Sequence, residues 1–150
     1  LGRTRAAHGV VHARYDPQVG SQSRMSEAAE QRWKLCELRN LDDPGSRAFA
    51  VGAGPWPLRG FVVRQNERVC AYVNRCPHAG HPLNLRPDRF LTEDGSLILC
   101  NSHGALFEPA TGVCVDGPCI GQQLQTLPIR VEDGLVLLDG DPDDLARRYG

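Results

Sequence analysis

Two short stretches decide the fold of this chain: CPHAGHPL at residues 76–83 and CNSHGALF at residues 100–107. Each stretch offers one cysteine and, two or three residues later, one histidine: Cys76 with His78 in the first, and Cys100 with His103 in the second. Two thiolates and two imidazoles form a ligand set that suits soft to borderline metals. The sequence therefore predicts a metal centre held between two loops.

The order of the ligands bears on which metal they hold. Zinc accepts two cysteines and two histidines, but its structural motifs usually take the cysteine pair from one element and the histidine pair from another. Here each loop mixes the two kinds. A binuclear [2Fe-2S] centre fits this arrangement, because the two cysteines can bind one iron while the two histidines bind the other.

The spacing C-x-H-x-G-x-x-L followed by C-x-x-H-G-x-x-F resembles the two cluster-binding boxes of the Rieske family. The resemblance extends to Thr111-Gly112 and Gly117-Pro118, the second of which is similar to the family's proline loop, and it covers residues 33–138. It implies one [2Fe-2S] cluster, with both histidine ligands at an exposed tip. The ligands implied are Cys76, His78, Cys100 and His103, surrounded by Gly80, His81, Leu83, Gly104, Ala105, Phe107, Gly117 and Pro118.

At four positions the chain resembles one branch of the family more than another. The respiratory branch has a Ser and a Tyr hydroxyl that donate to the cluster sulfurs, at positions occupied here by Ala105 and Phe107. That branch also joins its two loops by a disulfide, at positions occupied here by His81 and Ser102. Both departures indicate the low-potential, ferredoxin-like branch, so we expect a negative reduction potential near the lower end of the Rieske range of roughly −150 to +300 mV.

Several residues near the boxes have more than one interpretation. His81 could replace a ligand, exchange protons beside one, or be solvated, and we favour the solvated interpretation. Cys114 and Cys119 could form a local disulfide, a second metal half-site, or small buried apolar residues, and we favour the last. We expect Cys36 and Cys70 to be core residues.

The residues that line the boxes also have two interpretations each. Leu83 and Phe107 are expected to keep water from the cluster, although either could simply fill the core. The glycines at 80, 104 and 117 indicate positive φ or close backbone approach; ordinary turn glycines are the alternative.

Alternating apolar residues predict an all-β fold. Strands are expected near residues 33–38, 48–51, 61–63 with 69–73, 97–100 with 105–107, and 124–131 with 135–138, many of them paired as hairpins. Asp141-Pro142 followed by acidic and then basic residues predicts a short C-terminal helix. We expect an antiparallel β-sandwich or barrel with a small inserted cluster-binding subdomain, as the family resemblance also implies.

Length and charge limit the remaining possibilities. We expect a flexible N-terminal arm at 1–30, one Rieske domain at 31–140 with its cluster loops at about 74–120, and the helix at 141–150. The chain has 17 basic and 18 acidic residues, and residues 25–150 contain 13 and 17 of these, a net charge of −4. That balance argues against nucleic acid as a partner. The chain has no apolar run of membrane length. Two of its six cysteines are assigned to the metal centre and the other four are scattered, which fits a reducing cytoplasm.

The leading functional hypothesis is a soluble one-electron carrier with no catalytic site of its own. It would pass electrons from a reductase to a terminal oxygenase or a similar redox enzyme, docking at the tip formed by His78 and His103. One alternative is an accessory small subunit of a nitrite reductase-like or other oxidoreductase complex. Another is a zinc-stabilised interaction module without a redox role.

Overall fold

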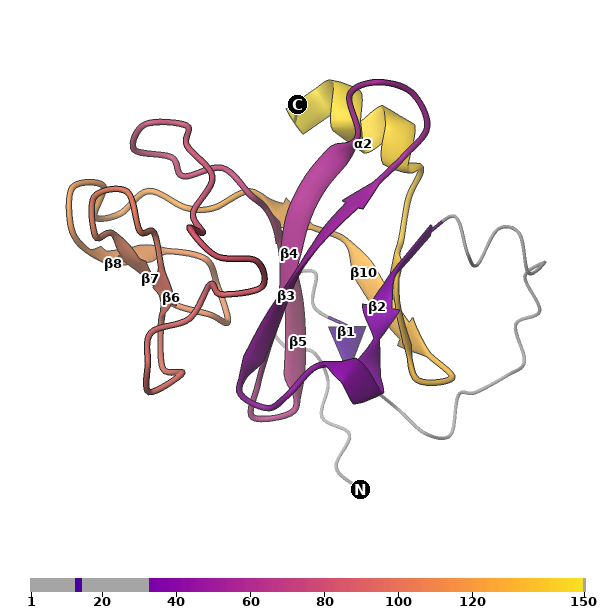
Figure 1. The fold of residues 1–150 in the computed structure, drawn as a ribbon, viewed down its shortest axis with the longest axis horizontal. Coiled ribbons are helices and arrows are strands. Elements are labelled where there is room, and N and C mark those ends of the chain that lie inside the picture. The colour runs from indigo at the N-terminus through magenta and orange to yellow at the C-terminus, as the bar shows by residue number, and fades with distance from the viewer. Residues whose placement is uncertain (1–12, 15–32, 150) are drawn as a thin grey trace.

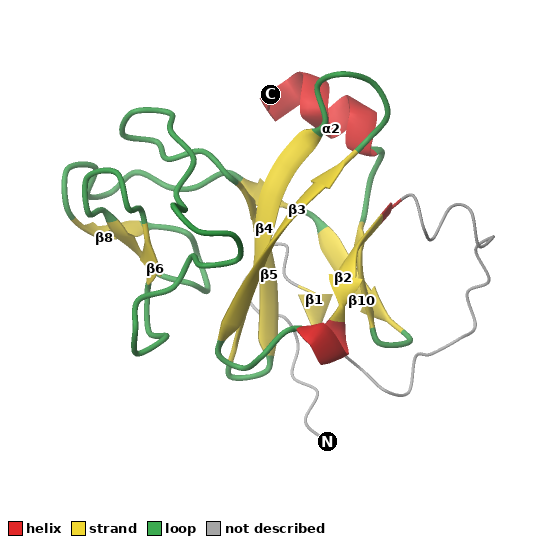
Figure 2. Ribbon diagram, viewed as in Figure 1, coloured by secondary structure: helices red, strands yellow, loops and turns green. Residues whose placement is uncertain are grey.

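The computed structural model describes residues 13–14 and 33–149, and most of the expected N-terminal arm lies outside this part. Strands and loops dominate the described residues (Figure 2). The elements in chain order are β1 (Ala13–Arg14), β2 (Lys34–Glu37), the 3-10 helix η1 (Leu38–Asn40), β3 (Gly45–Val51), β4 (Leu58–Gln65), β5 (Arg68–Val73), β6 (Ile98–Leu99), β7 (Leu106–Phe107), β8 (Cys114–Asp116), β9 (Thr126–Leu127), β10 (Ile129–Glu132), β11 (Leu135–Leu138) and α2 (Pro142–Tyr149).

The strands form three antiparallel sheets. Sheet A has the order β1-β5-β4-β3, with β9 also paired to β5; sheet B has the order β10-β11-β2; and sheet C has the order β6-β7-β8. Sheet A lies in the middle, with sheet C on one side and sheet B on the other (Figure 1). The expected all-β fold, with an inserted subdomain and a short C-terminal helix, is confirmed. The expected domain boundaries remain predictions.

Two tight turns fix the register of the main hairpins. Asn66 and Glu67 connect β4 to β5 with φ of 54° and 66°, and Asp133 and Gly134 connect β10 to β11 with φ of 53° and 77°. Positive φ at both central residues is what a type I′ hairpin turn requires, and this turn matches the natural twist of paired strands. Both hairpins were expected from the sequence. Strands β1 and β8 were not expected, because segments of two or three residues are too short to show an alternating pattern of apolar residues.

The hairpin of β4 and β5 is buried on both faces. Successive side chains of a strand point to opposite faces of its sheet. On one face, Val62 and Ala71 belong to a core shared with sheet B, which we call the barrel core. On the other face, Phe61 and Tyr72 belong to a second core shared with residues around sheet C, which we call the site core. All four side chains are at most 1% exposed, so one hairpin supports both cores.

Two contacts attach the inserted subdomain to this hairpin. The ring of Phe61 stacks on Phe90, with centroids 4.2 Å apart and an interplanar angle of 6°. The Tyr72 hydroxyl donates a buried hydrogen bond of 2.7 Å to the carbonyl of Pro109. Burial raises the pKa of Tyr72 well above its ordinary value, so the hydroxyl stays protonated and can donate.

Helix α2 begins as its sequence predicts. The Asp141 carboxylate accepts a hydrogen bond of 2.9 Å from the backbone N-H of Asp143, which is a capping interaction at the first turn. Leu145 then packs into the barrel core. The Asp143 carboxylate accepts a further bond of 2.9 Å from the N-H of Ala53, in the loop after β3. Among the described residues, no helix combines the length and apolar character needed to cross a membrane.

The Tyr72 contact gives a prediction about stability. Replacing Tyr72 by Phe leaves the buried Pro109 carbonyl without its donor, which should lower the free energy of unfolding by about 1–3 kcal/mol. The matched control is Tyr149→Phe, because the Tyr149 hydroxyl has no hydrogen-bond partner within residues 33–149. Chemical denaturation of the cluster-loaded proteins checks both variants. Equal stability of Tyr72→Phe and the wild type would contradict the prediction.

Candidate metal centre

The two cysteine loops have the same backbone design. In the first, the Cys76 carbonyl accepts from the N-H of Gly80 at 2.7 Å, and the Cys76 N-H donates to the His81 carbonyl at 2.8 Å. In the second, the Cys100 carbonyl accepts from Gly104 at 2.9 Å, and the Cys100 N-H donates to Ala105 at 2.9 Å. Each cysteine is therefore anchored at both of its backbone polar groups.

Glycine closes each of these turns. Gly80 has φ +77° and Gly104 has φ +81°, which lie in the left-handed region that L side chains rarely adopt. Both were expected at positions of positive φ. Each loop follows a strand, because β5 ends at Val73, three residues before Cys76, and β6 ends at Leu99, directly before Cys100.

The four candidate ligands separate by burial. Cys76 and Cys100 are 3% and 1% exposed and belong to the site core. His78 and His103 are exposed, and their ring centroids lie 4.9 Å apart with the rings nearly perpendicular. The structure thus brings the two imidazoles together at an exposed tip above a buried pair of cysteines, as expected.

The surroundings of Cys76 act on the pKa of its thiol in two directions. Burial raises the pKa of the Cys76 thiol, and the neighbouring Cys100 side chain raises it further. The backbone N-H groups of His78 and Ala79 donate to the sulfur and act in the opposite direction. These donors are available to stabilise a metal-bound thiolate.

Apolar side chains surround the cysteine pair. Leu83, Ala105 and Phe107 are each at most 1% exposed and belong to the site core, with Cys76 and Cys100. The sequence left open whether Leu83 and Phe107 fill the core or keep water from the sulfurs. Their position in the site core allows them to do both.

The proline loop lies against the second cysteine loop. A Cβ placed on Gly117 would lie 2.8 Å from Cα of Ala105, closer than real atoms approach, so a side chain does not fit there. Pro118, next in the chain, is exposed. This loop thus packs its backbone against the site and presents its proline to solvent.

Hydrogen bonds join the two cysteine loops directly. The N-H of Asn101 donates to the Leu83 carbonyl at 2.8 Å. His81 Nδ1 lies 3.0 Å from the hydroxyl of Ser102, so these exposed side chains link the loops where the respiratory branch has its disulfide. His81 is exposed, as expected, but it also has this partner.

Asn74 supports the first loop, and the sequence did not single it out. Its side-chain oxygen accepts from the N-H of Leu83 at 2.8 Å, and its amide donates to Asn84 at 3.0 Å. An asparagine before a cysteine has no distinctive pattern, so no sequence signal separates it from an ordinary loop residue.

The remaining cysteines are buried thiols, and all six cysteines lie in the described part of the chain and are free. The sulfurs of Cys114 and Cys119 are 3.4 Å apart, whereas a disulfide bond is about 2.05 Å long. Burial and the contact with Cys114 raise the pKa of Cys119 to about 12. Cys36 and Cys70 belong to the barrel core and the site core, and burial raises the pKa of Cys36 to about 11.

The donor set fits a binuclear cluster. Within the described residues, no three Cys, His, Asp or Glu side chains gather as ligands of a single metal ion would. The donors come instead as a buried thiol pair and an exposed imidazole pair. A [2Fe-2S] cluster takes two protein ligands at each iron, and in its histidine-ligated form the two kinds are segregated in this way.

Comparison with known proteins gives the family. The model of the Rieske [2Fe-2S] domain matches residues 31–129. The chain therefore belongs to the Rieske [2Fe-2S] family, and its cofactor is one [2Fe-2S] cluster. The zinc alternative is thereby removed.

The relatives are ferredoxins. The chain is 33% identical over 110 residues to the ferredoxin component of the alkene monooxygenase system of Xanthobacter autotrophicus, covering 72% of this chain and 80% of that one. The Sphingomonas yanoikuyae B1 ferredoxin has a similar structure, with a TM-score of 0.57 and 28% identity over 73% of this chain and 98% of the other.

A third comparison shows the fold alone. A chain in the complex of reduced oxygenase and oxidised ferredoxin of carbazole 1,9a-dioxygenase has a TM-score of 0.55 and 24% identity, covering 70% of this chain and 98% of its own. By the two relatives above, the chain is an electron-transfer protein of the Rieske ferredoxin type.

The geometry predicts which substitutions remove the cluster. Replacing Cys76, His78, Cys100 or His103 by alanine should reduce iron from about two atoms per chain to near zero and abolish the visible absorption, because each iron has only two protein ligands. Replacing Cys36, a buried cysteine of the barrel core, by alanine is the matched control and should leave the iron content unchanged. Iron and sulfide analysis of anaerobically purified protein measures both. Full iron content in His78→Ala or His103→Ala would refute the assignment.

Proposed function

We propose that this protein receives single electrons from a reductase and passes them to a terminal oxygenase, docking both partners at the tip formed by His78 and His103. In this proposal Cys76 and Cys100 hold one iron, and His78 and His103 hold the other. The bound cluster supplies reversible one-electron transfer. The chain's own residues hold it, exclude water from it and present one side of it to partners.

The observation that carries the proposal is the segregation of the ligands by exposure. The thiols lie in the site core, whereas both imidazoles reach solvent. A partner that contacts the tip would approach the histidine-held iron directly, while the cysteine side stays behind a layer of side chains. In the carbazole 1,9a-dioxygenase system, a ferredoxin forms a complex with its oxygenase.

The proposal also places the protein in the cytoplasm. All six cysteines are buried and free, and two of them are assigned to the cluster. A reducing compartment keeps such thiols from forming disulfides.

The side chains around the cluster support a low reduction potential. Ala105 and Phe107 are fully buried beside the cysteine pair, and neither carries a hydroxyl. A reduced cluster carries additional negative charge, and a hydroxyl donor to its sulfur would stabilise that state. Without such donors, the potential should stay near the lower end of the Rieske range, around −150 mV.

Substitution at these positions tests the origin of the potential. Ala105→Ser and Phe107→Tyr should each raise the midpoint potential, because a hydrogen bond to a charged group is worth about 1.5–3 kcal/mol, which corresponds to roughly 60–130 mV for one electron. Ala110→Ser is the control, since it adds a hydroxyl outside the two boxes. A redox titration followed by visible absorption gives the midpoints. A wild-type midpoint well above zero would contradict the low-potential assignment.

The partner assignment is tested by electron transfer. The holoprotein is cross-linked anaerobically in an extract of its own host, and the captured proteins are identified by mass spectrometry. We expect an oxygenase subunit among the captured proteins. Once purified, that subunit should reoxidise the reduced protein rapidly in stopped-flow mixing, whereas serum albumin, the control, should not. Capture of a nitrite reductase-like large subunit instead would favour the accessory-subunit alternative.

A further inference from the structure

A groove with a volume of about 660 Å³ lies beside the first cysteine loop. Its walls come from that loop, including His78, from the segment that leads into β9, and from the last turn of α2. The C-terminal end of α2 is directed toward the lobe that contains sheet C (Figure 1). The groove therefore opens next to one of the two exposed imidazoles.

The charge in this groove has one sign. Arg75, Arg147 and Arg148 line it, and no Asp or Glu does. Arg147 pairs with Asp144 on the same helix, and the Arg148 guanidinium lies 5.9 Å from the centre of the Tyr149 ring. Arg75 has no ion-pair or side-chain hydrogen-bond partner among residues 33–149. The groove is thus basic, although residues 25–150 together have a net charge of −4.

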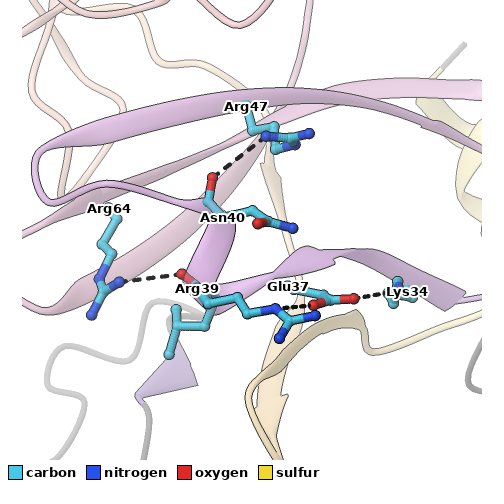
Figure 3. A network of polar contacts seen from close by, with 7 residues as sticks. Lys34, Glu37, Arg39, Asn40, Arg47 and Arg64 are labelled. Carbon is cyan, nitrogen blue, oxygen red and sulfur yellow. Dashed lines mark hydrogen bonds and ion pairs between the residues drawn. The ribbon is translucent and has the colours of Figure 1, made fainter.

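A second groove on the molecule gives the contrast. It has a volume of about 530 Å³ and is lined by residues of η1 and of the β10–β11 turn. Two arginines, Arg39 and Arg64, and two acidic residues, Glu37 and Asp133, line it, so the charges balance. Figure 3 shows Glu37 held between Lys34 and Arg39 in this region, and these two cations lower the pKa of its carboxyl. A uniform sign is therefore not a general property of grooves on this protein.

The ordinary role of arginines in the last turn of a helix explains only part of the basic groove. Arg147 and Arg148 sit where the helix dipole favours cations. Arg75 comes from the cysteine loop, far away in sequence, and gains nothing from that dipole. The dipole therefore accounts for two of the three arginines that line the groove, and not for Arg75.

We propose that the groove lined by Arg75, Arg147 and Arg148 binds an acidic segment of the redox partner and so orients that partner over His78. The inference rests on the proposed function, because it names a contact of the same docking tip. Guanidinium groups pair with carboxylates in a planar, two-point geometry. At physiological ionic strength, interactions between exposed charges are screened beyond about 8 Å. A bound acidic segment is therefore attracted by the nearby arginines more strongly than it is repelled by the distant acidic residues of the protein.

A hexaglutamate peptide labelled with fluorescein serves as the probe for this groove. We expect the holoprotein to bind it, measured by fluorescence anisotropy, and we expect the binding to weaken as sodium chloride is added. Arg147→Gln/Arg148→Gln should weaken binding roughly two- to twenty-fivefold, since each exposed ion pair contributes a factor of about 1.4 to 5. Arg75→Gln should weaken it by one such factor.

The matched control is Arg39→Gln/Arg47→Gln, which removes the same two charges from exposed arginines in the region of Figure 3. It should bind the peptide as the wild type does. Iron content and midpoint potential, measured on every variant, show that the cluster is intact.

Absence of binding by the wild type, or an equal loss in the control and in Arg147→Gln/Arg148→Gln, would overturn the inference. The peptide experiment does not use an oxygenase, so its failure is distinct from a failure of electron transfer to one.

Discussion

The structure depends on burial of both faces of a single hairpin. Strands β4 and β5 alternate between the barrel core, reached by Val62 and Ala71, and the site core, reached by Phe61 and Tyr72. Burial of apolar area is the main favourable term in folding. The hairpin of β4 and β5 contributes to this term on both of its faces. Cys76 and Cys100 also pack in the site core, so the sheet restricts the movement of the two cysteine loops.

Local backbone bonding completes what packing begins. A buried cysteine could be held in place by its side-chain contacts alone, but here both polar groups of its backbone are also fixed within a five- or six-residue turn. Because the turn is local, it places the histidine two or three residues later on the outside. The short spacing in the sequence is therefore what separates a buried thiol from an exposed imidazole.

This locality explains which features the sequence could predict. The ligand set and the two hairpin turns depend on neighbouring residues, and each had a readable pattern. The contact between Asn101 and Leu83 depends on how two separate loops meet, and the convergence of Arg75 with α2 depends on the whole chain. The Cys114 and Cys119 pair stayed open for the same reason, because its sulfur separation is set by the conformation of residues 115–118.

The same separation of thiol from imidazole governs how partners meet the cluster. In the proposed assignment, the two thiolates would hold their iron from within the site core, and the two imidazoles, which are neutral when they bind a metal, would be the exposed ligands of the tip. Neutral rings provide electronic contact but little electrostatic selection among partners. Selection must then come from fixed charges around the tip, and in the described part of the chain the uniformly basic wall beside His78 can supply it. In this way electron transfer depends on the cluster ligands, whereas partner choice depends on the arginines of the groove. A change in those arginines could then alter the choice of partner without altering the cluster.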